Sequence, residues 1–293
     1  MTLAPLRVHV MRAARLWNVI GPVILSAFSL FVSFHILQPL ALALDPTFTL
    51  LANRSVGKIA FTMLIITHIC LLMSTLSYAT CKQWVITNVS FLGSTKWIKP
   101  FALTFLAFFT LHWCILFSLV ALGYASVHPE TLTDLVPKAG SLLLGFIATF
   151  FLAWTEETIF RGTLYPILCQ TFSPLASIFG TSLIFSLAHN ITNPLMLISD
   201  DWKLGLGLFL LGFLLNLIFS ISSKLYIGMG AHAGLVYVKV FLRRIPLISV
   251  SSSIPWYLHG DLRQSVAIHV LFACSIIGTM LIYRKNLRLI PKV

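Results

Sequence analysis

Residues 145–161 read GFIATFFLAWTEETIFR, an apolar run that carries two adjacent glutamates, Glu156 and Glu157, near its end. The other acidic residues of the chain fall in the breaks between apolar segments. An ionisable side chain at membrane depth costs about 2.5–3.5 kcal/mol on insertion scales, so it is a candidate functional group by default. The pair therefore predicts a functional site inside an apolar helix.

The composition indicates a membrane protein. Hydrophobic residues make up 58% of the 293 residues and charged residues only 10%, whereas a soluble domain carries about 25% charge. The net charge of +12 comes from basic residues that cluster at the ends of the apolar segments. Anionic headgroups and topology explain them there, so the expected partner is the lipid bilayer and not nucleic acid.

Eight segments are long and apolar enough to cross a bilayer, which needs about 20 residues: 17–44, 59–80, 100–127, 140–161, 174–198, 204–222, 225–242 and 265–283. The intervening segment 162–173 is too short to span, and Gly162 and Pro166 would interrupt a helix there. We therefore expect an all-α, polytopic fold in one integral membrane domain, residues 1–293. It has about eight transmembrane helices, with a short interfacial or re-entrant helix at 162–173.

The loop charges predict that both termini lie in the cytoplasm. Basic residues without acids precede the first span, follow the second and fill the C-terminal tail, whereas acids fall in the alternate loops. The loop around Arg243, Arg244 and Arg263 departs from this pattern. Short termini without a transit-like peptide favour a bacterial inner membrane as the location.

Helical spacing gives the two glutamates different neighbours. Glu157 and Arg161 lie four residues apart on one face, with the glutamate first, which is the favoured order for an ion pair. Glu156 points about 100° away and has no such local partner. Burial should raise the pKa of this unpaired carboxyl, which suits a general base. The alternative is that both glutamates only bind neighbouring helices.

Two of the nine histidines stand out by their context. His189 ends the run FSLAH, in which Phe185 lies one turn earlier on the same face. His232 lies in GMGAHAG, residues 228–234, where small residues let neighbouring helices approach and bring the imidazole to polar groups. A lone histidine on an apolar helix is more often a core residue, so the ordered set matters more than either member.

The ordered set resembles the motifs of the CPBP (Abi) intramembrane proteases, which include the type II CAAX prenyl endopeptidases. The residues that carry the resemblance are Glu156, Glu157 and Arg161, then Phe185 and His189, then His232. The resemblance covers about residues 140–245, which it identifies as a CPBP/Abi-like catalytic core. It departs at position 236, where the family has asparagine or a similar polar residue and this chain has Val236.

The resemblance implies an endopeptidase that hydrolyses a peptide bond of a membrane-associated protein or peptide, prenylated tails included. Glu156 would activate water, and His189 and His232 would orient it, bind a metal or stabilise the oxyanion. Glu157 and Arg161 would form a supporting ion pair. A Zn²⁺ ion held by Glu156, His189 and His232, with water as fourth ligand, and a metal-free reaction with Glu156 as base both remain open.

Two other functions are compatible with these residues. Val236 cannot donate a hydrogen bond, and losing an oxyanion donor costs about 10²–10³ in rate, so the chain is a weakened scaffold on the protease fold unless another donor replaces it. The candidate replacements are Asn190, Asn193 and Asn216. The second alternative function is a proton-coupled transporter, because intramembrane carboxylates and histidines also build proton relays.

The predicted helices raise one geometric difficulty. If residues 140–161 and 174–198 are antiparallel neighbours, Glu156 and His189 lie at depths that differ by about 10–15 Å. The site closes if segment 162–173 crosses part of the membrane, which we expect. A separation of Glu156 and His189 above about 8 Å would leave no place for one bridging water and would argue against catalysis.

Overall fold

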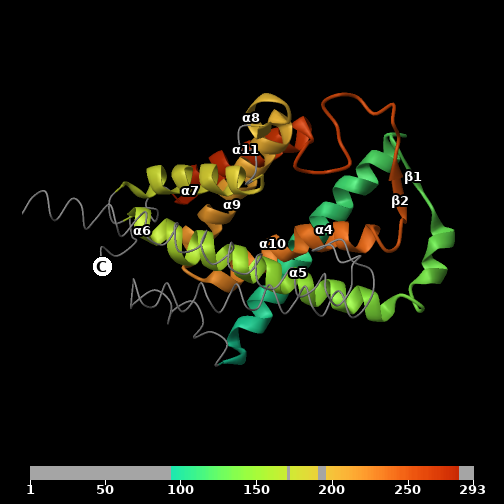
Figure 1. The fold of residues 1–293 in the computed structure, drawn as a ribbon, viewed down its shortest axis with the longest axis horizontal. Coiled ribbons are helices and arrows are strands. Elements are labelled where there is room, and N and C mark those ends of the chain that lie inside the picture. Colours follow the sequence, from blue (N-terminus) through green and yellow to red (C-terminus); the bar gives the residue numbers. More distant parts are fainter. Residues whose placement is uncertain (1–93, 170–171, 191–195, 284–293) are drawn as a thin grey trace, which may run out of the picture.

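The computed structural model describes residues 94–169, 172–190 and 196–283, and these are helical apart from one short β-ribbon (Figure 1). The helices are α4 (Ile98–Ala121), α5 (Ala139–Ile159), α6 (Tyr165–Cys169), α7 (Pro174–Ala188), α8 (Met196–Ser199), α9 (Trp202–Ser222), α10 (Leu225–Leu242) and α11 (Val266–Tyr283). Shorter turns are the 3-10 helices η2 (Thr95–Trp97) and η3 (Pro129–Asp134) and the π-helical turn η4 (Phe160–Leu164). Strands β1 (Ala125–Val127) and β2 (Ile248–Val250) pair antiparallel.

The described residues confirm a polytopic membrane protein. Five helical segments are long and apolar enough to cross a bilayer: Thr95–Ala121, Ala139–Gly162, Trp202–Ser222, Leu225–Leu242 and Val266–Tyr283. The predicted spans 17–44 and 59–80 lie outside the described residues. Both termini lie outside them too, so the cytoplasmic location of the termini stays a prediction.

The predicted span 100–127 is wrong at its C-terminal end, because α4 stops at Ala121 and residues 125–127 form β1. Gly123 has φ 77°, the left-handed conformation that commonly ends a helix. The N–H groups of Gly123 and Tyr124 bind the carbonyls of Val120 and Leu119, which satisfies the last turn. The chain then reverses into β1, which pairs with β2 beyond the ends of the helices (Figure 1).

The predicted span 174–198 is also wrong, because α7 ends at Ala188 and α8 is a separate short helix. The His189 side chain is the physical reason. Its Nδ1 lies 2.8 Å from the Phe185 carbonyl oxygen, the acceptor that the His189 backbone N–H would use in a continued helix. The His189 N–H binds the Ser186 carbonyl instead, and the helix tightens and stops.

Segment 162–173 is not the separate helix that Gly162 and Pro166 suggested. Helix α5 continues through the π-turn η4 into α6, so one helical rod runs from Ala139 to Cys169. In η4 the Tyr165 N–H reaches back five residues to the Phe160 carbonyl. The wider turn accommodates Pro166, which has no N–H to donate.

The longer rod removes the expected depth difference between Glu156 and His189. Helix α7 packs against α6 and runs back along the rod, and Figure 1 shows the two side by side. Glu156 lies about four helical turns before the end of α6, and His189 lies about four turns after the start of α7. The two residues therefore reach the same depth.

Glycines bring α10 close to α4, as the small-residue run predicted. A Cβ atom on Gly230 would overlap the Phe101 carbonyl, and one on Gly234 would overlap the Phe105 carbonyl. Such close approach is typical of small-residue contacts between membrane helices. With Gly230 and Gly234 facing α4, His232 is left to face α5.

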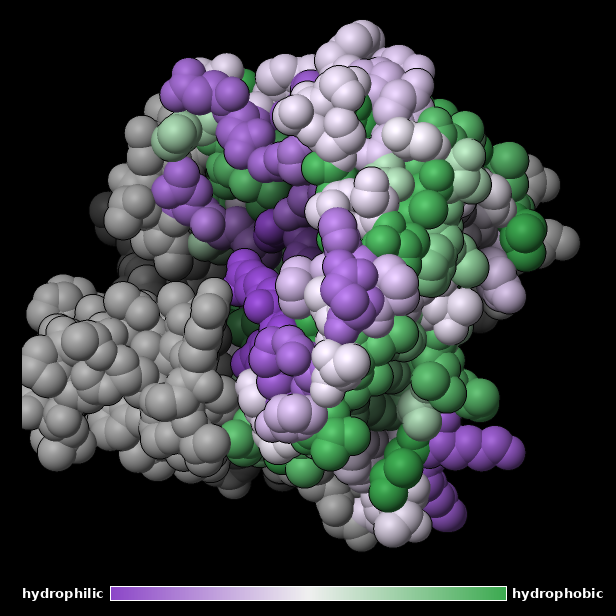
Figure 2. Space-filling view, turned by 90° about the vertical axis from the view of Figure 1, so that its right-hand side faces the viewer, coloured by the Kyte–Doolittle hydropathy of each residue, from purple (hydrophilic) through white to green (hydrophobic). Residues whose placement is uncertain are grey.

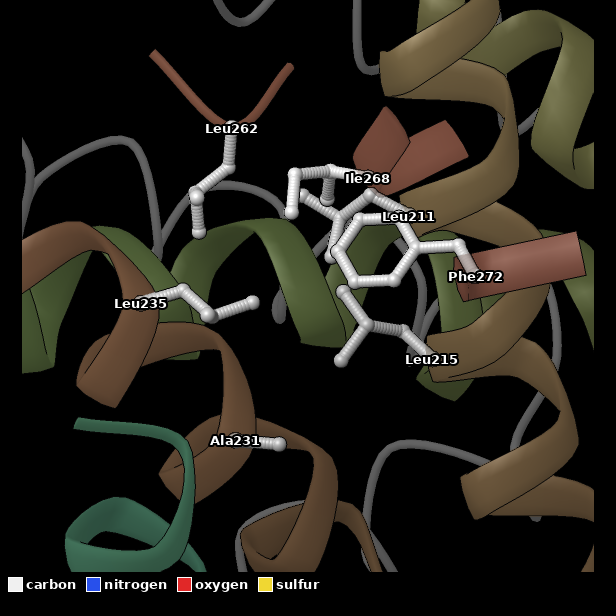
Figure 3. Close-up of a cluster of buried hydrophobic side chains, with 7 residues drawn as sticks. All are labelled: Leu211, Leu215, Ala231, Leu235, Leu262, Ile268 and Phe272. Carbon is white, nitrogen blue, oxygen red and sulfur yellow. The ribbon is translucent and has the colours of Figure 1, made fainter. Parts of the chain in front are cut away.

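A hydrophobic cluster holds α9, α10 and α11 together with the loop before α11 (Figure 3). Its buried members are Leu211, Leu215, Ala231, Leu235, Leu262, Ile268 and Phe272. The connection from α9 to α10 is only Ser223 and Lys224, with Ser223 in the left-handed conformation at φ 52°. These contacts fix α10 as the central helix, between α4 and α5 on one side and α9 on the other.

Candidate active site

The predicted ion pair between Glu157 and Arg161 is formed in the core. Both side chains are 0% exposed, and Arg161 Nη1 donates to Glu157 Oε1 at 3.0 Å. Arg161 Nη2 donates to the Gly212 carbonyl of α9 at 2.9 Å, and its guanidinium lies 4.7 Å from the Phe185 ring centroid. Buried charges are tolerated only when paired in this way. Arg161 thereby ties the α5 rod to α7 and α9.

His232 is held by the same carboxylate. Its Nδ1 lies 3.0 Å from Glu157 Oε1, and a carboxylate oxygen can only accept, so Nδ1 carries the hydrogen. Behind the carboxylate is Gly228, where a Cβ atom would lie 2.9 Å from Glu157 Oε2. This arrangement fixes the ring of His232 and directs Nε2 away from Glu157.

Glu156 meets both histidines. Its Oε2 lies 3.9 Å from His189 Nε2 and 3.8 Å from His232 Nε2. His189 donates through Nδ1 to the Phe185 carbonyl, so its Nε2 also carries a lone pair when the ring is neutral. Among the described residues, no group forms a hydrogen bond with Glu156 Oε2. Three polar atoms, from α5, from the cap residue that follows α7 and from α10, thus lie close together.

Phe185 packs against both histidines of this cluster. It is fully buried, and its ring makes edge-to-face contacts with His189 at 4.6 Å and His232 at 6.2 Å between centroids. The Arg161 guanidinium and the Phe160 ring lie against the same side chain. The phenylalanine therefore positions both histidines, a role that its spacing from His189 alone did not reveal.

Two glycines of the site were missed by sequence reasoning. Gly212 supplies the carbonyl that binds Arg161, and a Cβ atom there would lie 3.0 Å from the Phe185 ring. Gly228 leaves room for the Glu157 carboxylate. Gly228 begins the quoted run 228–234, so its position was a usable signal, whereas a backbone carbonyl such as that of Gly212 has no signature in the sequence.

The candidate replacements for the donor that Val236 lacks form contacts of their own. Asn216 is fully buried on α9, and its Nδ2 donates to Ser182 Oγ of α7 at 3.0 Å. Asn190 donates to Met196 Sδ at 3.8 Å, and Asn193 lies outside the described residues. Val236 itself lies one turn after His232 on the same face of α10.

The three converging side chains have the donor types of a zinc site but not its spacing. Ligands about 2.1 Å from a tetrahedral zinc ion lie about 3.4 Å apart, and the two N···O separations here are longer. In the part of the chain that the structure describes, no three His, Cys, Asp or Glu side chains are placed to hold a metal ion.

Comparison with known proteins agrees with the motifs. Residues 138–238 match the family described as "Type II CAAX prenyl endopeptidase Rce1-like". This range runs from the start of α5 into α10 and contains every residue of the converging cluster. Residues 138–238 therefore form a domain of that family, which confirms the resemblance drawn from the sequence. No curated protein and no solved structure matches the chain.

Proposed function

We propose that the Rce1-like domain makes this chain an intramembrane endopeptidase, with Glu156 as the base that activates water. The observation that supports this most is the convergence of Glu156 Oε2, His189 Nε2 and His232 Nε2, with separations of 3.8 and 3.9 Å. A water molecule at an ordinary hydrogen-bond length of about 2.8 Å fits between the oxygen and either nitrogen. The Glu156 side chain is 21% exposed and that of His189 is 25% exposed, whereas the Oε2 atom itself is buried.

The reaction is a general-base hydrolysis. Glu156 accepts a proton from the water as its oxygen attacks the carbonyl carbon of the scissile peptide, which gives a tetrahedral oxyanion. The protonated Glu156 then gives that proton to the leaving nitrogen as the C–N bond breaks. The products are a carboxylic acid and an amine, and Glu156 returns to its ionised form. His189 orients the water through Nε2.

His232 is the group best placed to stabilise the oxyanion. Its Nδ1–H is bound to the Glu157 carboxylate, so Glu157 stabilises the ring when Nε2 also carries a proton. An Nε2–H directed at the reacting carbonyl then donates to the developing negative charge. Arg161 balances the charge of Glu157.

We propose a membrane-associated protein or peptide as the substrate, with a prenylated tail as one class. The family match supports this class, because its description names a CAAX prenyl endopeptidase. We propose that both termini lie in the cytoplasm, which is the topology that the loop charges favour.

The decisive test compares wild type with Glu156→Gln on a library of quenched peptides that includes prenylated tails, with the purified protein in detergent. The variant should lose at least 10²-fold in rate, the usual scale for a general base, with unchanged thermal unfolding. Glu130→Gln is the matched control, because Glu130 is 70% exposed in η3 and should leave the rate unchanged. Equal rates for wild type and Glu156→Gln would disprove the assignment of Glu156 as the general base.

The same assay tests whether cleavage depends on a metal ion. We expect a chelator to leave cleavage intact, because the separations within the cluster are too long for a zinc ion. Loss of cleavage with a chelator, and recovery with Zn²⁺, would overturn the metal-free reaction. A folded wild type that cleaves nothing in the library would instead favour a scaffold weakened at Val236.

A further inference from the structure

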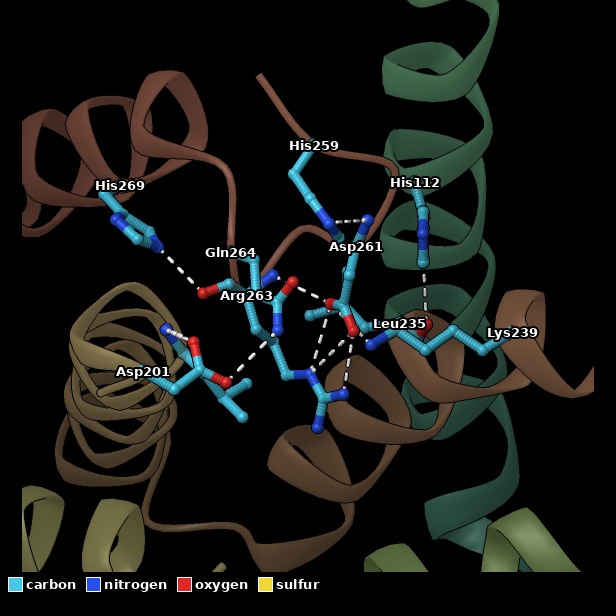
Figure 4. Close-up of polar contacts among 10 residues, drawn as sticks. His112, Asp201, Leu235, Lys239, His259, Asp261, Arg263, Gln264 and His269 are labelled. Carbon is cyan, nitrogen blue, oxygen red and sulfur yellow. Dashed lines mark hydrogen bonds and ion pairs between the residues drawn. The ribbon is translucent and has the colours of Figure 1, made fainter. Parts of the chain in front are cut away.

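The polar side chains outside the converging cluster are of two kinds. Figure 2 shows hydrophilic side chains in a band across the end of the molecule that carries β1 and β2. There Lys239 Nζ donates to Asp261 Oδ1 at 2.6 Å, and Arg263 Nη2 donates to the same carboxylate at 2.8 Å (Figure 4). The second kind lies on α6, α7 and α9 and is buried. These buried groups lack the partners that the exposed ones have.

Five buried atoms on these helices have no hydrogen-bond partner among the residues that the structure describes. They are the hydroxyls of Tyr165, Ser177, Thr181 and Ser220 and the Oδ1 atom of Asn216. None of the five side chains is more than 9% exposed. Buried polar atoms nearly always bind another protein group or an ordered water, and leaving them without either is unfavourable. A group of them in one region therefore indicates bound water.

Helical spacing places these atoms on faces that meet. Residues four apart on a helix lie on one face, and the polar residues of the three helices follow this spacing. The sets are Arg161, Tyr165 and Cys169 on the rod, Ser177 and Thr181 on α7, and Gly212, Asn216 and Ser220 on α9. Helix α7 packs against both α6 and α9. The polar faces are therefore directed into the space that the three helices share.

Contacts at the inner end and in the middle tie the faces together. Arg161 Nη2 of the rod donates to the Gly212 carbonyl of α9 at 2.9 Å. One turn further along α9, Asn216 Nδ2 donates to Ser182 Oγ of α7 at 3.0 Å. From Gly212 to Ser220 the helix rises about 12 Å. With waters about 2.8 Å apart, this length holds about four molecules in single file.

The outer end lies where α6 ends and α7 begins, away from the β-ribbon (Figure 1). Tyr165 lies beside Ser220 there, and Cys169 lies beside Ser177. Within the described part of the chain, these contacts do not complete a hydrogen bond for any of the three hydroxyls. Cys169 is partly exposed, and Ser173, the N-cap of α7, is exposed. Solvent can therefore reach this end.

The inner end is the Arg161 guanidinium. Its Nη1 donates to Glu157 and its Nη2 to the Gly212 carbonyl, whereas Nε has no partner in the described ranges. A guanidinium has five N–H donors and accepts nothing, so water can only bind it as an acceptor. Hydration also lowers the cost of holding a charge at membrane depth. A water on Nε would therefore complete the contacts of the buried ion pair.

We propose that the side chains of Tyr165, Ser177, Thr181, Asn216 and Ser220 line a column of bound water. The column enters between the ends of α6, α7 and α9 and reaches Arg161 Nε, so it hydrates the buried ion pair from the side away from His232. This inference does not rest on the proposed peptidase function. The competing arrangement is a dry contact in which each serine and threonine hydroxyl turns to the carbonyl four residues before it.

The first test measures whether a small hydrophilic ion enters the column. Thr181→Cys places a thiol midway along it, and Ile184→Cys places one on the exposed face of the same helix, which lipid covers. The probe is Ag⁺ in chloride-free buffer, with the protein in lipid nanodiscs. Mass spectrometry of the peptides reports each thiol separately, so the native cysteines stay in place. Ag⁺ binds the thiolate, which forms in water and not in apolar surroundings.

Thr181→Cys should therefore react about tenfold faster than Ile184→Cys or more. Equally slow reaction of the two thiols in folded protein would show that the space is dry and would overturn the column. Thermal unfolding confirms that both variants are folded.

Filling the outer end tests where the water enters. Ser177→Met, added to Thr181→Cys, should lower the rate to that of Ile184→Cys, because the longer side chain occupies the column one turn nearer its entrance. Ala176→Met is the matched control, because Ala176 is exposed on the neighbouring face and should leave the rate unchanged. Ser220→Met fills the column from α9 and serves where Ser177→Met does not fold. A rate that survives both fillings would overturn the assigned entrance.

Thr181→Val tests the bound water without a probe. Valine has nearly the shape of threonine and lacks the hydroxyl. If water binds the hydroxyl, the variant leaves that water short of a partner, and the unfolding temperature falls. If the contact is dry, the variant removes an unpaired hydroxyl and the temperature stays the same or rises, which would contradict the proposal. None of these measurements uses cleavage, so the column and the peptidase function can fail independently.

Discussion

Two charged clusters lie on one face of α10, and they differ in burial and in the balance of their charges. Around His232, Glu157 and Arg161 are completely buried and matched one to one. Around Lys239, the side chains are partly exposed, and two cations share Asp261. A buried charge without a partner costs several kcal/mol, so the first cluster has one arrangement. Partly exposed charges are screened more strongly and exchange partners at smaller cost, so two cations can share one carboxylate in the second cluster.

The largest expected effect comes from breaking the buried pair. Arg161→Met should destabilise the protein by about 3–5 kcal/mol, because it leaves the Glu157 charge buried without its partner. Thermal unfolding in detergent measures this loss. Arg263→Met in the exposed cluster is the comparison and should cost no more than about 1 kcal/mol. Similar losses for the two variants would remove the distinction between the clusters.

A double variant separates the effect of the buried ion pair on stability from its effect on activity. Glu157→Gln combined with Arg161→Met removes both charges and should recover part of the stability lost by Arg161→Met alone. It should not recover activity, because a neutral amide cannot stabilise a protonated His232. Full recovery of activity would show that the pair is only structural.

The buried cluster could be predicted in part from the sequence. The Glu157–Arg161 pair follows from helical spacing, which is local. The contact of Glu156 with His189 does not, because it depends on how far the helix continues past Gly162 and Pro166. A π-turn carries the helix through these residues, and a hydrogen bond from its own side chain stops α7 at His189. Neither event has a periodic signature.

The exposed cluster explains an exception to the loop charges. Arg243, Arg244 and Arg263 broke the positive-inside pattern of the sequence. In the structure Arg263 binds Asp261, and Arg244 Nε donates to Ser141 Oγ of α5 at 2.8 Å. Charges that serve contacts within the protein carry less information on topology than a simple count assumes. The sequence could not separate these two uses of arginine.

Val236→Asn tests whether the cluster around His232 lacks a hydrogen-bond donor at position 236. Position 236 lies on the same face as His232, one turn nearer to Lys239. An asparagine there places a hydrogen-bond donor beside the reacting carbonyl, and one such donor is worth about 10²-fold in rate or more. We therefore expect a higher kcat with little change in KM. A lower rate would show that another group already occupies this role.

Gly228→Ala should weaken the buried cluster without removing any charge. The new methyl group would lie 2.9 Å from Glu157 Oε2, and Arg161 and His232 bind the other oxygen, Oε1, so the carboxylate has little freedom to move. The expected cost is about 1–2 kcal/mol, within the range of overpacked cores, with a lower kcat. Gly140→Ala is the matched control, because nothing lies within 4 Å of its Cβ position in α5. Equal effects of the two would show that Glu157 moves freely.

The smallest expected effect is the pH dependence of the exposed cluster. The folded state holds the pKa of Asp261 well below its unfolded value, so the ionised carboxylate stabilises the protein above that unfolded value of about 4. The contribution is lost as the pH falls through the folded pKa. Asp261→Asn should therefore cost about 1 kcal/mol near pH 7, and its unfolding temperature should approach that of wild type as the pH falls below about 4. A difference that stayed constant from pH 7 to pH 3 would mean that Asp261 contributes through its shape and hydrogen bonds and not through its charge. In that case Lys239 and Arg263 would not need a counter-ion to lie side by side.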